Sequence, residues 1–182
     1  MFKNEKMKKL KNTGFIVLIV IVLIVLLFFF TTGVILFKND GNSTFSGRDL
    51  LFGSTYSYTY GYNTYVTTHT STFHPSPLTV ISFILTILSF FSLLFGSYLS
   101  TKDDRSLLFV SFIMHIITIA FLSLSFVLML FIPLQVILSI KSSSYKGGIL
   151  GVGYIFAALL SLLSAIYLAI PTVAIAKEKL FK

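Results

Sequence analysis

Four long runs of apolar residues constrain the fold of this chain more than any other feature. They cover residues 14–37, 78–99, 107–132 and 149–176. A helix needs about 20 apolar residues to cross the hydrocarbon core of a bilayer, and each run is long enough. We therefore predict an all-α membrane protein, a four-transmembrane-helix bundle. Pro133 and Gln135 follow the third run, whose helix is expected to end near residue 132 or to continue to 140.

Composition supports a lipid solvent. The chain is 55% hydrophobic and 11% charged, whereas a soluble domain is about 25% charged. Cysteine is absent, which excludes disulfides, thiolate metal ligands and a thiol nucleophile. The first run is too long for a cleaved signal peptide and lacks a small-residue cleavage site. We interpret it as an uncleaved anchor.

Lysine and arginine indicate the orientation. The net charge is +8, and ten of the 14 basic residues fall in segments 1–13, 100–106 and 177–182. Basic residues accumulate on the cytoplasmic side, so both termini and the 100–106 turn are predicted to be cytoplasmic, with the plasma membrane as the expected location. Segments 38–77 and 141–148 then form the outer loops. Lysines beside apolar runs favour contact with anionic lipid over nucleic acid.

Small and polar residues recur at steps of three and four along three of the runs, as expected for helix interfaces in lipid. The second run carries Thr79, Ser82, Thr86, Ser89 and Gly96, and the third carries Ser111, His115, Thr118 and Ser125. The fourth carries Gly153, Ala157, Ser161, Ala165 and Ala169, each four apart. The first run has no comparable stripe, so we expect its helix at the periphery.

His115 is the one titratable group in the middle of a predicted span. Such a residue can handle a proton or ligand, or it can hydrogen-bond a facing Ser or Thr, which its seam position favours. No nucleophile with a positioned base, phosphate loop or metal-ligand cluster is present, so we expect no enzyme activity and no cofactor. His69 and His74 could bind a metal only weakly because no third ligand lies nearby.

The first outer loop is β-prone. Tyr56, Tyr58, Tyr60 and Tyr62 alternate with small residues, and period two is typical of strands. A turn at residues 61–63 and a second strand at 64–72 would complete a hairpin. Its tyrosine face is either an interfacial belt or a recognition surface. Asn42 begins an N-glycosylation sequon on the predicted outer side.

The order of these segments resembles the claudin and peripheral-myelin-protein superfamily of four-span proteins. The most specific similarity is the glycine and aromatic start of the last helix, residues 148–154, followed by Ala157. The family's tryptophan and cysteine signature cannot exist here, because both residue types are missing. The resemblance implies a non-catalytic membrane protein that associates laterally and presents its first outer loop.

From the sequence we expect a structural, adhesive or membrane-organising protein that sits in the lipid bilayer and presents its Tyr- and Thr-rich outer loop. It would associate laterally, with itself or with other membrane proteins, through small-residue helix stripes; the stripe of the fourth run would drive packing within or between copies. The alternative is a small subunit of a transporter or channel complex, because Ser and Thr seams can also line a pore.

Overall fold

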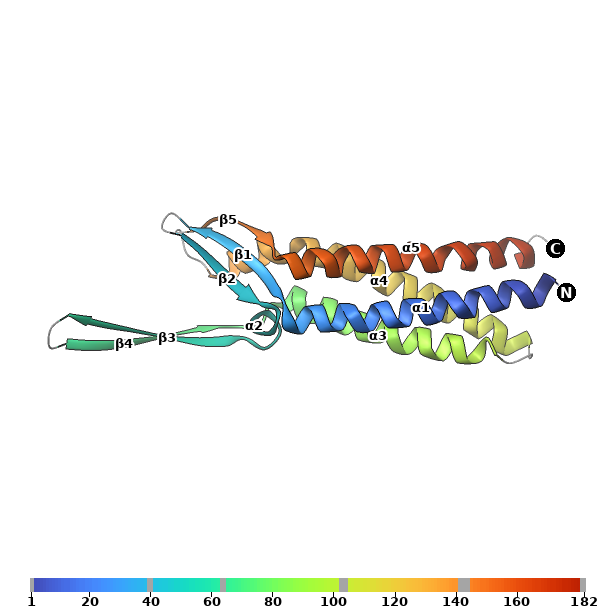
Figure 1. The fold of residues 1–182 in the computed structure, drawn as a ribbon, viewed down its shortest axis with the longest axis horizontal. Helices are drawn as coiled ribbons and strands as arrows, with labels where there is room; N and C mark the ends of the chain where they lie inside the picture. Colours follow the sequence, from blue (N-terminus) through green and yellow to red (C-terminus); the bar gives the residue numbers. More distant parts are fainter. Residues whose placement is uncertain (1, 39–40, 63–64, 102–104, 141–144, 181–182) are drawn as a thin grey trace.

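The computed structural model describes residues 2–38, 41–62, 65–101, 105–140 and 145–180. Its long helices are α1 (Phe2–Phe30), α3 (Pro77–Leu99), α4 (Arg105–Ile140) and α5 (Val152–Leu180). Four helices are long and apolar enough to cross a membrane, as predicted. Figure 1 shows both termini at one end of the helices and all the strands at the other.

The strands form two separate sheets. Strands β1 (Thr32–Lys38), β2 (Gly41–Ser46) and β5 (Tyr145–Leu150) form an antiparallel sheet in the order β2-β1-β5. The short helix α2 (Gly47–Phe52) leads to a hairpin of β3 (Ser54–Tyr62) and β4 (Tyr65–Phe73). Both outer loops thus contribute to the first sheet, and the first loop alone makes the hairpin.

The first spanning helix ends earlier, and the last one begins later, than the apolar runs predicted. Helix α1 ends at Phe30, and the rest of the first run forms β1, while Ile149 and Leu150 belong to β5 and not to the last helix. An apolar run alone cannot distinguish a buried strand from a helix. Here Val34 and Leu36 are fully buried in the hydrophobic cluster between the sheet β2-β1-β5 and the adjoining helix ends, which we call the outer core. This burial explains why β1 is apolar.

Helix α4 continues through Pro133 to Ile140, which is the longer of the two expected extents. Its 36 residues would extend about 54 Å at 1.5 Å per residue, well beyond a hydrocarbon core of about 30 Å. The extra turns support the sheet, because Val136 is fully buried in the outer core and Ile137 and Ile140 pack against it.

The helices form a closed ring in which α1 contacts α3 and α5, and α4 contacts the same two helices. The prediction of a peripheral first helix is wrong. The apolar span of α1 is buried to the same extent as that of α4 and slightly more than that of α3. The buried face of α1 is formed by Val17, Ile21, Ile24 and Phe28. Large apolar side chains therefore pack this helix without a small-residue stripe.

Glycines fix the sheet to the helices at the point where α1 becomes β1. The Gly47 N–H donates to the Thr31 carbonyl at 2.9 Å, and the Gly151 N–H donates to the Gly33 carbonyl at 2.8 Å. A Cβ on Gly47 would overlap the Phe28 carbonyl, and one on Gly151 would overlap the Thr32 carbonyl. Side chains at these two positions would therefore force the backbones apart.

Candidate functional site

The interface between α3 and α4 is a polar seam inside the bundle. The sequence spacing had assigned these residues to one face of each helix, and in the structure all of them are buried. From α3 they are Thr79, Ser82, Thr86, Ser89 and Gly96, and from α4 they are Ser111, His115, Thr118 and Ser125. The seam holds two neighbouring helices together over most of the length of α3.

Most hydroxyl groups of the seam donate to backbone carbonyls, whereas Ser82 Oγ has no hydrogen-bond partner among the described residues. Thr86 and Ser125 both donate to the Ser82 carbonyl oxygen, at 2.9 and 3.0 Å, and their own oxygens lie 3.1 Å apart. Ser111 Oγ donates across the interface to the Gly96 carbonyl at 2.7 Å. Hydroxyls used in this way are not available to line a water-filled path.

His115 lies at a junction of three helices. Its Nδ1 is 2.7 Å from the Ser111 carbonyl oxygen, so Nδ1 carries the hydrogen and Nε2 of the neutral ring is an acceptor. Nε2 and Ser97 Oγ are both buried, and neither has a hydrogen-bond partner among the described residues. A Cβ on Gly14 of α1 would lie 2.7 Å from Ser97 Oγ and 3.8 Å from Nε2.

The junction combines one acceptor nitrogen and one hydroxyl beside a glycine backbone. It has the groups to form a hydrogen bond but holds no second titratable group among the described residues. The sequence analysis missed the contributions of Gly14 and Ser97. The sequence signal for them was weak, because neither Gly14, at the start of the first run, nor Ser97, beside Gly96, belongs to a periodic stripe.

The small-residue stripe of α5 is used inside the bundle. Gly153, Ala157, Ser161 and Ala165 are buried, and Ala169 is half-buried. A Cβ on Gly153 would overlap the side chain of Thr31 at the end of α1. Ala157 belongs to the outer core, which also contains Phe28 and Met129. The stripe therefore packs α5 against α1 and α4.

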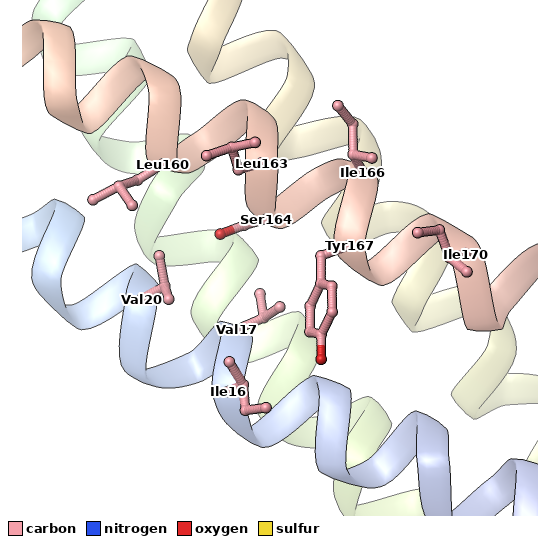
Figure 2. A pocket seen from close by; sticks show the side chains of 9 residues that line it. All are labelled: Ile16, Val17, Val20, Leu160, Leu163, Ser164, Ile166, Tyr167 and Ile170. Carbon is pink, nitrogen blue, oxygen red and sulfur yellow. The ribbon is translucent and has the colours of Figure 1, made fainter.

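A groove lies between α1 and α5 (Figure 2). Its volume is about 410 Å³, and apolar side chains form most of its lining. The lining residues are Ile16, Val17, Val20, Leu160, Leu163, Ser164, Ile166, Tyr167 and Ile170. Several of these side chains are exposed on the outer surface of the bundle, among them Ile16, Leu163 and Ile166. The groove therefore opens toward the space that lipid would occupy.

Gln135, predicted to mark a helix end, instead caps a neighbouring helix. Its Oε1 accepts hydrogen bonds from Ser76 Oγ at 2.6 Å and from the Leu78 N–H at 3.2 Å. Ser76 is the N-cap of α3 and accepts from the Thr79 N–H. The first N–H groups of a helix lack partners within it, so α4 supplies one acceptor for the start of α3.

Replacing Gln135 with methionine should lower the thermal unfolding midpoint in detergent by roughly 3–10 °C. The reason is that two partly buried donors lose their acceptor, at a cost of about 1–3 kcal/mol. Gln135→Glu keeps the acceptor oxygen and should retain most of the stability. Leu138→Met, at an exposed position of the same helix, is the control. A Gln135→Met midpoint equal to that of the control would contradict this role.

Helix α2 positions the base of the hairpin. A capping box joins Ser46 and Asp49 at its start, and Gly53 at its end adopts φ 76°, a conformation that glycine accepts most easily. The Phe45 and Phe73 rings lie 4.7 Å apart between centroids, which ties the end of β4 to β2. Within the described residues, these contacts hold the base of the hairpin to the rest of the protein.

The hairpin itself extends away from the helices (Figure 1). Its ladder runs from Ser54 opposite Phe73 to Tyr62 opposite Tyr65 without a register shift. Tyr56, Tyr58, Tyr60 and Tyr62 occupy alternate positions of β3, but their side chains lie outside the described part of the structure. The structure thus gives the hairpin that the alternation predicted, with the second strand at Tyr65–Phe73, and leaves both interpretations of its tyrosine face as predictions.

The remaining predicted positions lie in the outer region. Asn42 is exposed in β2, where its sequon is accessible. His69 lies within β4, and the exposed His74 follows that strand. Among the described residues there is no group of three or more potential metal ligands.

Comparisons with protein-family models, curated proteins and solved structures found no match at the significance threshold.

Proposed function

We propose that this is a non-enzymatic multi-pass membrane protein of the structural, adhesive or membrane-organising type. Its β3–β4 hairpin is the contact surface, and it projects from the outer face of the plasma membrane while both termini are cytoplasmic. This is also the role that the resemblance to claudin-like four-span proteins implies. One observation carries the proposal: the projecting hairpin has open edges and no charged residue.

Unpaired strand edges readily bind further strands. Proteins usually protect such edges with charged side chains, prolines or bulges. Residues 54–73 contain no Asp, Glu, Lys, Arg or Pro, and their ladder has no register shift. In the described part of the chain, β3 and β4 pair only with each other. Each strand therefore offers one unpaired edge to a partner.

The other sheet has part of the protection that the hairpin lacks, although its β2 edge also carries no charge or proline. Its edge strand β5 carries Lys146, and both ladders of β1 contain a register shift. The two sheets of one small protein thus differ in edge protection. This difference supports a contact role for the hairpin, because the absence of charged residues is specific to the hairpin and is not shared by the neighbouring sheet.

The helices give less support than the hairpin does to association between copies. The α5 stripe, which the sequence suggested could join copies, packs against α1 and α4 of the same chain. Its residues are therefore proposed to hold the bundle and not to join neighbouring copies. The hydrogen-bonded α3–α4 seam likewise favours a sealed interface over the pore of a channel subunit.

Charges introduced at the hairpin edges test the function in cells. In the double variant Thr59→Lys/Thr70→Lys, the lysines lie on opposite strands but are not direct partners, since Thr59 pairs with Thr68 and Thr70 pairs with Ser57. Any strand added to either edge would meet a new charge. We expect lateral diffusion of the labelled protein, measured by fluorescence recovery, to become several-fold faster.

The matched control is Thr59→Ser/Thr70→Ser, which keeps the hydroxyls and adds no charge. It should diffuse like the original protein. If both variants diffuse like the original, the hairpin is not the contact surface. Ion flux through proteoliposomes that depends on the α3–α4 seam would instead favour the channel-subunit alternative.

A further inference from the structure

The groove between α1 and α5 is a built site that the proposed function does not use. Within the described residues, no hydrogen bond is made by Ser164 Oγ or by the Tyr167 hydroxyl. Ser164 is only 4% exposed, and Figure 2 shows its oxygen turned toward the space between the helices. Figure 2 also shows the Tyr167 ring extending from α5 toward α1.

These hydroxyls lie deep in the predicted bilayer. The apolar spans are Leu10–Phe30 in α1 and Val152–Ala176 in α5, so Ser164 is at the centre of the second span and Val20 at the centre of the first. No headgroup or bulk water reaches this depth. An unpaired hydroxyl in hydrocarbon is costly, and most intramembrane Ser residues instead find a helical or interhelical partner.

The other serine and threonine of α5 follow that rule, whereas Ser164 does not; elsewhere in the bundle, Ser82 Oγ and Ser97 Oγ are also without a partner among the described residues. One turn earlier, Ser161 Oγ donates to the Ala157 carbonyl at 2.9 Å, and two turns later Thr172 Oγ1 donates to the Leu168 carbonyl at 2.7 Å. Ser164 forms no such bond to its own helix. Its hydroxyl is therefore available as a donor to a molecule in the groove.

We propose that this groove binds a neutral lipid of the membrane midplane that carries a carbonyl or hydroxyl oxygen within its apolar body. The oxygen accepts hydrogen bonds from Tyr167 and Ser164, and the apolar body packs on Val17, Val20 and Leu160. A volume of about 410 Å³ lies within the range of roughly 300–1,000 Å³ typical of small-molecule sites. Quinones with a hydrocarbon tail have this combination of groups.

The rim of the groove argues for a lipid over a transmembrane helix. Close helix contacts in membranes use small residues that let the backbones approach. Here the exposed lining is large or branched: Ile16 at 47% exposure, Leu163 at 58% and Ile170 at 61%. In α5, the small residues Gly153, Ala157, Ser161 and Ala165 are buried inside the bundle. A flexible or flat molecule fits between such side chains more easily than a second helix does.

Binding can be measured on the full chain in detergent micelles with decylbenzoquinone as the probe and decylbenzene, which lacks oxygen, as its comparison. A ligand of the folded state raises the unfolding midpoint. The quinone should raise it at concentrations at least ten-fold lower than decylbenzene. Tyr167→Phe and Ser164→Ala should each weaken quinone binding roughly ten-fold and leave decylbenzene unchanged.

Ser161→Ala is the matched control, because it makes the same chemical change one turn away and outside the groove. It should bind the quinone like the original protein. Equal effects of the two probes, or quinone binding unaffected by both groove variants, would overturn the proposal.

A second measurement identifies the occupant in native membranes. A photoreactive p-benzoylphenylalanine at Leu163 should form adducts enriched in an oxygen-bearing neutral lipid, compared with the same group at Ile155, an exposed position outside the groove. Crosslinks at Leu163 to a protein, whether a second copy or another chain, would overturn the lipid assignment. This outcome is independent of the hairpin and of the proposed function.

Discussion

Replacing Gly151 with alanine should lower the unfolding midpoint by about 10 °C or more and reduce the yield of monodisperse protein. A Cβ at this position would overlap the Thr32 carbonyl oxygen and lie 2.6 Å from the Thr32 carbonyl carbon. Backbone cannot rotate away as a side chain can, so β1 and the start of α5 must separate. Overpacking ordinarily costs about 1–3 kcal/mol of unfolding free energy. We expect the cost of Gly151→Ala to lie at or above the upper end of that range, because the overlap is with backbone atoms.

The matched control is Gly147→Ala. Gly147 lies in the same segment, but a Cβ there would have nothing within 4 Å, so the midpoint should stay within about 2 °C of the original. Gly47→Ala, which would overlap the Phe28 carbonyl, should resemble Gly151→Ala. Equal midpoints for Gly147→Ala and Gly151→Ala would show that the sheet is not fixed to the bundle in the way described.

Replacing Gly96 with leucine should cause the second large loss of stability, with a midpoint roughly 5–10 °C lower. A Cβ on Gly96 would lie 3.0 Å from Met114 Cβ and 3.1 Å from His115 Nδ1. The branched leucine side chain would push α3 away from α4. It would also stretch the hydrogen bond from Ser111 Oγ to the Gly96 carbonyl, which is 2.7 Å long.

A graded series separates packing from hydrophobicity. Gly96→Ala needs a shift of only a few tenths of an ångström and should lose much less stability than Gly96→Leu. Ala174→Leu adds comparable bulk to an exposed, lipid-facing position of α5 and should be close to neutral. If Gly96→Leu and Ala174→Leu have the same unfolding midpoint in detergent, α3 and α4 are not in close contact at Gly96.

The number and order of the spanning helices could be predicted because about 20 consecutive apolar residues match the thickness of a bilayer and are rare in soluble domains. The seam faces were also predictable, since a step of three or four keeps residues on one side of a helix. Thr86 and Ser125 illustrate this: spacing placed each on a face, although it could not identify them as neighbours.

The first and last helix boundaries could not be predicted in the same way. Most of β1 and the last two residues of β5 are as apolar as the helices beside them. Their strand conformation depends on pairing partners far away in the sequence, such as Ile35 opposite Ile149. The capping role of Gln135 is similarly non-local, because its partners Ser76 and Leu78 lie 59 and 57 residues away.

The groove was missed for a related reason. Ser164 and Tyr167 belong to no periodic stripe, and the groove exists only because α1 and α5 are neighbours in space. The hairpin, in contrast, could be predicted from alternation over a few residues. Local patterns were therefore informative, while a site shared between distant segments required the structure.

The central claim is that the uncharged hairpin is outside the cell while both termini are inside. The absence of cysteine allows a direct measurement with single-cysteine variants and a membrane-impermeant maleimide on sealed cells. Thr59→Cys should react at once, and Lys179→Cys only after the membrane is permeabilised. Reaction of Lys179→Cys on intact cells, with Thr59→Cys protected, would contradict both the orientation and the proposed contact surface.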